Sequence, residues 1–175
     1  MQSSVPENHP LRDLFRGLVE QVFMTEIGIC DPRLTDYLSR LLADFVHIDA
    51  IYRLRTVDGE VIRDLSRVEA EAYLGPDVDE VTRRRLISRY VGDFSLFWTG
   101  VYPESLRGRR GSDRLGEFVV QGRRGYSIAS ELSDPECEPA PSLLQQLSEE
   151  FENCVHGLHL VREGWRIHEQ RFRKN

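Results

Sequence analysis

The chain has few cysteines, and their pattern excludes two kinds of structural support. Its 175 residues include only Cys30, Cys137 and Cys154. An odd number of widely spaced cysteines, without a CxxC pair, fits neither a disulfide framework nor a zinc site. A hydrophobic core must therefore hold the fold, and a chain of this length buries about 70% of its unfolded surface, which is enough for one domain.

The chain also lacks an apolar run of about 18 residues, so the sequence predicts no transmembrane helix. The first ten residues, MQSSVPENHP, are polar and lack the apolar stretch of a secretory signal. Both absences predict a cytoplasmic protein with no membrane partner.

Positive charge is in the minority. Lysine and arginine together number 23 and aspartate and glutamate 29, which gives a net charge of −6. Nucleic-acid binders draw affinity from neutralising phosphates, so this balance argues against nucleic acid as a partner. Hydrophobic residues at 40% and charged residues at 30% are typical of a folded globular protein.

Apolar residues recur at helical spacing in the N-terminal part of the chain. Between Leu11 and Phe23 they follow the i, i+3, i+4, i+7 pattern of an amphipathic helix, and we expect Gly28 to end that helix. Asp31 and Pro32 then predict a second helix, with Asp31 as its N-cap and Pro32 at its first position.

Residues 51–63 leave two alternatives open. They alternate around Asp58-Gly59, a strong turn signal, and could form a hairpin. Alternatively, the second helix continues to about Arg55 and a loop follows. We favour the continued helix slightly, because an isolated two-stranded hairpin is only marginally stable.

The rest of the chain also shows helical patterns. Helices are expected over residues 64–74, 79–100, 112–132 and 143–168, with a short one after Pro103. The 112–132 helix is predicted despite its glycines, each of which costs about 1 kcal/mol against alanine in a helix interior. Ser142 is the expected N-cap of the last helix.

Five to six helices with short connections predict an all-α, single-domain helical bundle. Residues 1–10 are expected to form a flexible N-terminal arm, residues 11–168 the bundle and residues 169–175 a polar C-terminal tail. We expect the core to contain aromatic side chains from several helices: Phe15, Phe23, Phe45, Phe94, Phe97, Trp98, Phe151 and Trp165.

Residues 92–104 read GDFSLFWTGVYPE. Together with the Tyr126 region and the segment LSEEFENCVHGLHLV at 147–161, this stretch resembles a family of small, all-helical bacterial proteins with no known activity. The resemblance covers most of residues 10–165. It implies a helical fold and brings no substrate, cofactor or ligand with it.

The same stretch gives the 79–100 helix a wide aromatic face, which spans about 140° of a helical wheel. Such a face predicts a packed core with a tight corner. Gly100 lies near the edge of this face, where close helix approach or a C-cap would explain a glycine. A ligand pocket lined by Trp98 and Tyr102 is the alternative.

A carboxylate-bridged metal centre would need acidic and histidine side chains that point into the bundle. The candidates are Asp44, His47, Glu149, Glu152, His156 and His159. On a helical wheel, Glu149 and His156 lie opposite the apolar stripe, and His47 lies about 180° from Leu38. Since a metal site must project inward, we predict no metal ligands and no cofactor.

Two carboxylates lie at the margin of an apolar face instead. One is Asp93, and the other is Asp49 if the second helix extends that far. A carboxylate in this position must be paired or hydrogen-bonded, or its pKa rises. A structural ion pair with Arg53 or Arg89, or a helix cap, is the simpler interpretation. A functional site is the alternative, because perturbed carboxylates also occur there.

The sequence predicts no catalytic residue. Cys154 and His156 are two positions apart on one helix and do not face each other. Cys154 belongs to the apolar stripe, where an unreactive thiol is expected. No GxSxG, P-loop, GxGxxG or HExxH motif is present.

Two stretches are rich in basic residues. The first contains Arg107, Arg109, Arg110, Arg114, Arg123 and Arg124, and the second contains Arg162, Arg166, Arg171, Arg173 and Lys174. Either stretch could contact phosphate or an acidic partner. An exposed, flexible loop is the simpler interpretation of the first.

The sequence thus favours a helical binding or assembly module without catalysis of its own, which acts on a protein partner or on itself as a possible homodimer. The alternative is an enzyme or sensor with a buried small-molecule or metal site, for which Asp49, Asp93, Trp98 and Tyr102 are the candidate ligand-binding residues. A third hypothesis, a regulator that touches nucleic acid through residues 107–124, is opposed by the net charge.

Overall fold

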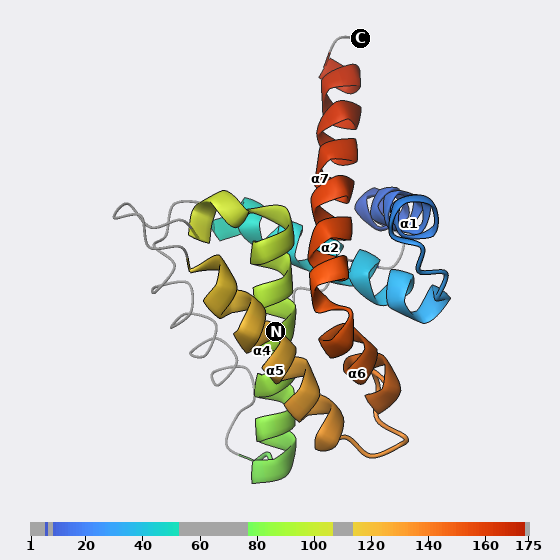
Figure 1. Ribbon diagram of the computed structural model, residues 1–175. Coiled ribbons are helices and arrows are strands. Elements are labelled where there is room, and N and C mark those ends of the chain that lie inside the picture. The colour runs from blue at the N-terminus through green and yellow to red at the C-terminus, as the bar shows by residue number, and fades with distance from the viewer. Residues whose placement is uncertain (1–5, 7–8, 53–76, 107–113, 174–175) are drawn as a thin grey trace.

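The computed structural model describes residue 6 and residues 9–52, 77–106 and 114–173, apart from the side chains of 47–52 and 172–173 (Figure 1). Within these ranges the chain forms helices and no strands, which confirms the all-α helical bundle. The elements are α1 (Pro10–Val22), the π-helix η1 (Phe23–Ile27), α2 (Pro32–Tyr52), α4 (Glu80–Val101), the 3₁₀ helix η3 (Pro103–Leu106), α5 (Leu115–Glu131), α6 (Pro141–Glu149) and α7 (Phe151–Arg173). None of the helices described combines the length and hydrophobicity that a membrane crossing requires.

The sequence signals for the end of the first helix and the start of the second are confirmed. Gly28 has φ 80°, a left-handed conformation that glycine adopts without steric cost, and it ends η1. Asp31 Oδ1 accepts a hydrogen bond from the backbone N–H of Arg33 at 2.9 Å, so it caps α2. α2 continues to Tyr52, and both the rest of the 51–63 segment and the helix expected at 64–74 lie outside the described residues.

The single helix expected over residues 143–168 is wrong, because two helices cover this part of the chain. α6 ends at Glu149, and α7 starts at Phe151 in a new direction (Figure 1). The turn lets α6 pack on α5 while α7 packs on α4 and α1, which one straight helix could not do. Neither glycine nor proline marks the break, so the sequence pattern did not show it.

Both ends of this region also differ from the prediction. α6 begins at Pro141 with Ala140 at the cap position, so Ser142 is not the N-cap. Proline is well suited to the first helical position because it has no N–H to leave unpaired. At the other end, α7 continues to Arg173, well into the stretch expected to be a tail.

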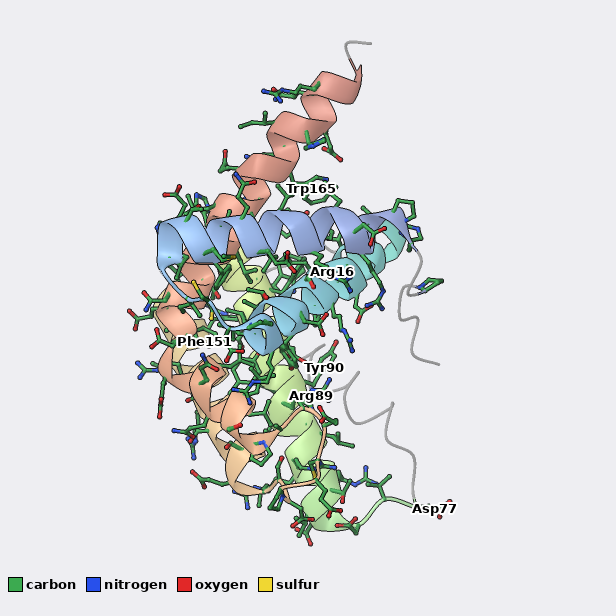
Figure 2. The ribbon with its side chains drawn as sticks, turned by 90° about the vertical axis from the view of Figure 1, so that its right-hand side faces the viewer. Arg16, Asp77, Arg89, Tyr90, Phe151 and Trp165 are labelled. Atoms are coloured by element: carbon green, nitrogen blue, oxygen red, sulfur yellow. The ribbon has the colours of Figure 1, made fainter. Side chains whose placement is uncertain are left out.

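The expected aromatic core is present. Of the eight aromatic residues expected in the core, six are buried, and the other two, Phe45 and Trp165, are partly buried against them. Trp165 of α7 lies beside α1 (Figure 2), where its ring meets that of Phe15 edge to face at 5.3 Å. The helices are therefore held together by contacts that the hydrophobic pattern predicted.

Helix α4 is the central element, because it contacts α2, α5 and α7. Its second half, from Gly92 to Val101, is buried on every side rather than on one face as the helical wheel suggested. A Cβ atom on Gly100 would lie 2.7 Å from the Cβ of Leu158, so close approach of α4 and α7, not a C-cap, explains this glycine. Any polar side chain in this half of α4 must find its partner inside the protein.

Candidate functional site

Asp93 lies at the start of the buried half of α4 and is 9% exposed. Its Oδ1 accepts hydrogen bonds from the hydroxyl groups of Tyr37 in α2 and Tyr126 in α5, at 2.5 and 2.7 Å. Its Oδ2 lies 3.6 Å from Nε of Arg89, one turn earlier in α4. We call these four residues the Asp93 centre, and they connect three helices.

The Asp93 centre agrees in part with the sequence analysis. Asp93 was expected to need a partner, and the ion pair with Arg89 confirms one of the two proposed. The hydrogen bonds from Tyr37 and Tyr126 were missed. Helical spacing places the ring of Tyr37 among the apolar residues of α2, but it does not show what the hydroxyl group contacts. The side chain of Asp49, and Arg53, lie outside the described residues.

Burial sets the protonation of the Asp93 centre. It raises the pKa of Asp93, although the charge of Arg89 and the two tyrosine hydrogen bonds act in the opposite direction. Burial and the neighbouring carboxylate raise the pKa values of Tyr37 and Tyr126 well above the ordinary range. Both phenols therefore stay protonated and act as donors.

Two glycines allow α4 and α5 to approach closely enough for these bonds. A Cβ atom on Gly92 would lie 2.7 Å from the ring of Tyr126. A Cβ atom on Gly125 would lie 2.6 Å from the carbonyl oxygen of Ser88. Because real Cβ atoms do not approach so closely, only glycine lets Tyr126 reach Asp93 without displacing a helix.

The polar side chains of the Asp93 centre contact one another within the protein. One carboxylate oxygen receives two hydroxyl donors, and the other faces Arg89. A buried carboxylate held in this way stabilises the arrangement of α2, α4 and α5, since removing a partner would leave an unsatisfied buried group. The observed contacts are those of a structural polar centre.

Among the described side chains, those considered as metal ligands do not gather, and the side chain of His47 lies outside the described residues. Glu149 and His156 are exposed, as predicted, and Glu152 and His159 are exposed as well. Asp44 forms an ion pair with Arg12 at 3.4 Å. No cluster of three or more histidine, cysteine or acidic residues that could hold a metal ion occurs in the described ranges.

Trp98 and Tyr102 lie in the aromatic core, and their ring centroids are 5.7 Å apart. Trp98 also contacts the rings of Phe94 and Phe97. The guanidinium carbon of Arg162 lies 5.2 Å from the centroid of the Tyr102 ring. The structure thus brings Trp98 and Tyr102 together but gives Asp93 a different set of partners.

Cys154 is fully buried, and burial raises its pKa to about 12. The thiol is therefore protonated at neutral pH, and a protonated thiol is a poor nucleophile. His156, two positions later, is exposed. Both observations agree with the prediction that this pair forms no nucleophilic centre.

Arg162 belongs to the second basic stretch, for which contact with phosphate or an acidic partner was considered, but its guanidinium is engaged inside the protein. Its side chain is 7% exposed and binds both carboxylate oxygens of Glu104, in η3, at 2.8 and 2.6 Å. Partial burial tends to raise the pKa of Glu104, but the bonds from Arg162 outweigh it and hold that pKa below its usual range. This second ion pair fastens α7 to the corner that follows α4.

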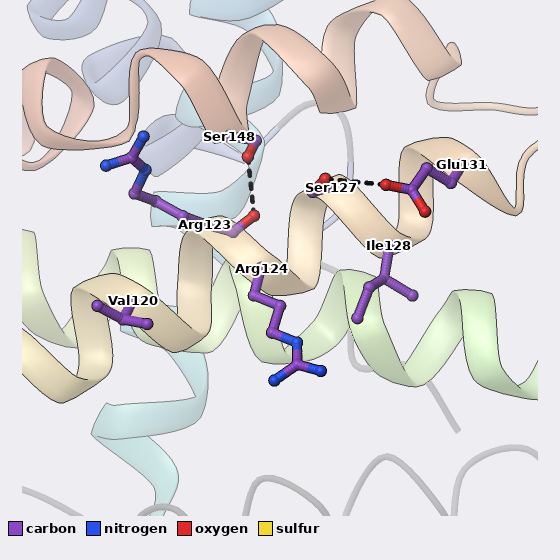
Figure 3. A pocket seen from close by; sticks show the side chains of 7 residues that line it. All are labelled: Val120, Arg123, Arg124, Ser127, Ile128, Glu131 and Ser148. Atoms are coloured by element: carbon purple, nitrogen blue, oxygen red, sulfur yellow. Dashed lines mark hydrogen bonds between the residues drawn. The ribbon is translucent and has the colours of Figure 1, made fainter.

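The surface carries a hollow of about 420 Å³ along α5 (Figure 3), which the sequence analysis did not predict. It is lined by Val120, Arg123, Arg124, Ser127, Ile128, Glu131 and Ser148. Arg123 and Arg124 point away from each other in Figure 3, and Arg123 lies 3.7 Å from Glu152. The two arginines therefore do not form one anion site, and Arg107, Arg109 and Arg110 lie outside the described residues.

No protein-family model, no curated protein and no solved structure matches this chain.

Proposed function

We propose that this protein is a cytoplasmic binding or assembly module without catalysis of its own, and that it contacts a protein partner through the outer face of α5. By this face we mean Glu117, Val120 and Arg124. The observation that supports the proposal is a difference in pairing. Asp93 and Arg162 are buried and engaged inside the protein, whereas Arg124 is exposed and has no ion pair or hydrogen bond among the described residues.

The composition of the outer face of α5 suits a protein interface. Val120 is 65% exposed, which makes it one of the most exposed large apolar residues in the described chain. Arginine is enriched at protein interfaces, where its stem covers apolar surface and its guanidinium forms several hydrogen bonds. A mixed apolar and charged face of this kind fits a partner that is in part polar.

Site-specific photo-crosslinking in the native host tests this proposal. A photoreactive amino acid replaces Val120, and in a control it replaces Met24 of η1, which is 59% exposed. We expect a discrete protein adduct from position 120 that Arg124→Glu weakens, and no such adduct from position 24.

Equal adducts from both positions would overturn the proposal, because contact would then not depend on α5. Absence of an adduct at position 120, with a stoichiometric metal or small molecule in the purified protein, would also overturn it. That result would favour the alternative of an enzyme or sensor with a site near Asp49 and Asp93.

A further inference from the structure

The outer face of α5 carries an alternating pattern of charge around an apolar residue. Glu117, Val120 and Arg124 occupy positions i, i+3 and i+7, which fall within an arc of about 60° on a helix. All three side chains are exposed. The helix thus presents an acid, an aliphatic group and a base in one row.

Glu117 and Arg124 cannot neutralise each other within one chain. Seven residues separate them, a rise of about 10.5 Å, whereas helical ion pairs form between residues three or four apart. Neither residue has a hydrogen bond or ion pair among the residues that the structure describes. Their neighbour Arg123 differs, because its Nη1 lies 3.7 Å from Oε1 of Glu152.

Two copies of this pattern complement each other when the helices that carry them are antiparallel. If two α5 helices pack antiparallel around an axis between positions 120 and 121, Arg124 of each copy meets Glu117 of the other. The two Val120 side chains then meet close to the axis. A parallel pair in register would instead place like charges together, which is destabilising. The arrangement has the reciprocal contacts that a two-fold interface requires.

A second antiparallel register, with Arg124 opposite Glu131 of the other copy, is less favourable. The axis would then pass between Ser127 and Ile128 and leave the two Val120 side chains far apart and exposed. Glu131 also already accepts a hydrogen bond from Ser127 at 3.3 Å. The first register buries the more exposed aliphatic residue and uses two charges that have no partner among the described residues.

We propose that the partner of the outer face of α5 is a second copy of this chain, bound antiparallel through two reciprocal Arg124–Glu117 ion pairs around Val120. This inference rests on the proposed function and names its partner. α5 has 17 residues and is about 25 Å long, so two such helices bury less than the roughly 800 Å² per partner of a standard interface. The dimer is therefore weak and depends on protein concentration.

Sedimentation velocity of the full chain over a concentration series tests the proposal. The wild-type protein is expected to dimerise with rising concentration. Arg124→Glu and Glu117→Arg each place two pairs of like charges in the dimer, and each is expected to raise the dissociation constant at least about tenfold. The matched control Arg123→Glu changes a neighbouring exposed arginine that points away, and it should dimerise like the wild type.

Mixing the two reversed variants gives the decisive result. In a heterodimer, the glutamate introduced at position 124 of one chain meets the arginine introduced at position 117 of the other. The unchanged Glu117 of the first chain likewise meets the unchanged Arg124 of the second. The equimolar mixture should therefore dimerise although neither variant does so alone. Circular dichroism of each variant confirms that the exposed substitutions leave the fold intact.

Three results would overturn the inference: a wild type that stays monomeric, variants that dimerise like the wild type, or a mixture that shows no recovery. A monomeric wild type whose position 120 cross-links to a different protein would leave the proposed function standing and remove only the second copy. Recovery with Glu131→Arg in place of Glu117→Arg would also overturn the stated pairing.

Discussion

The Asp93 centre and the outer face of α5 use charge in opposite ways. In the Asp93 centre every charged or hydroxyl group contacts another across three helices, and the carboxylate is nearly inaccessible to solvent. On the outer face of α5, Glu117 and Arg124 are exposed and have no partner among the described residues.

The difference follows from the cost of burial. A buried charge loses its hydration, and the free energy of folding is unfavourable unless another group of the protein pairs with it. An exposed charge is solvated and costs almost nothing when unpaired. The paired group therefore reports on how the protein folds, whereas the unpaired group is available to another molecule.

The largest change in stability is expected when Asp93 itself is replaced. Asp93→Ala removes the acceptor of two buried hydroxyl groups and the partner of Arg89, so we expect the free energy of unfolding to fall by about 3–5 kcal/mol. Urea denaturation measures this change. The control Asp36→Ala removes exposed ion pairs with Arg40, at 3.0 Å, and Arg16, at 3.8 Å, and should cost at most about 1 kcal/mol. Equal losses would show that the Asp93 centre adds no more stability than an exposed ion pair.

A smaller loss of stability is expected when a glycine between α4 and α5 is replaced. Gly125→Ala forces a methyl group against the Ser88 carbonyl oxygen, and we expect it to cost about 1–3 kcal/mol because backbone, not a flexible side chain, must move. Gly116→Ala, in the first turn of the same helix, meets nothing within 4 Å and should stabilise the protein by up to about 1 kcal/mol. Thermal unfolding of both variants checks the signs, and a neutral Gly125→Ala would contradict the packing argument.

The smallest effect concerns pH and separates burial from ion pairing at Asp93. Because the pKa of Asp93 is raised in the folded state, its contribution to stability is full below about pH 4 and is lost as the pH rises through the folded pKa. Asp93→Asn does not titrate. The stability difference between wild type and this variant should therefore be largest at acid pH and shrink toward neutrality.

The exposed N-cap Asp79 provides the opposite case. Its hydrogen bonds with Thr82 lower its pKa, so its contribution is present above about pH 4 and is lost on acidification. The difference between wild type and Asp79→Asn should grow toward neutral pH. If Asp93→Asn behaved in the same direction, the Arg89 ion pair rather than burial would control the pKa of Asp93.

Local signals predicted much of the fold. The Asp31-Pro32 start of α2, the turn at Gly28 and the aromatic core were all expected, because capping and amphipathic spacing are properties of short segments. The break at Glu150 was not expected, since nothing in its local sequence marks it. It depends on two surfaces, α5 and α4, that α6 and α7 reach in different directions.

The buried charges of Asp93 and Arg162 also show what the sequence determined and what only the tertiary structure decided. By itself, the sequence determined that Asp93 needs a partner, because helical periodicity places it beside an apolar face and a carboxylate there must be satisfied. Only the tertiary structure decided that Tyr37 and Tyr126 join Arg89 as those partners, and that Glu104 meets Arg162 across 58 positions of chain. Periodicity reports which face of one helix is buried, but distant side chains meet only where whole helices pack, and that packing depends on the entire core.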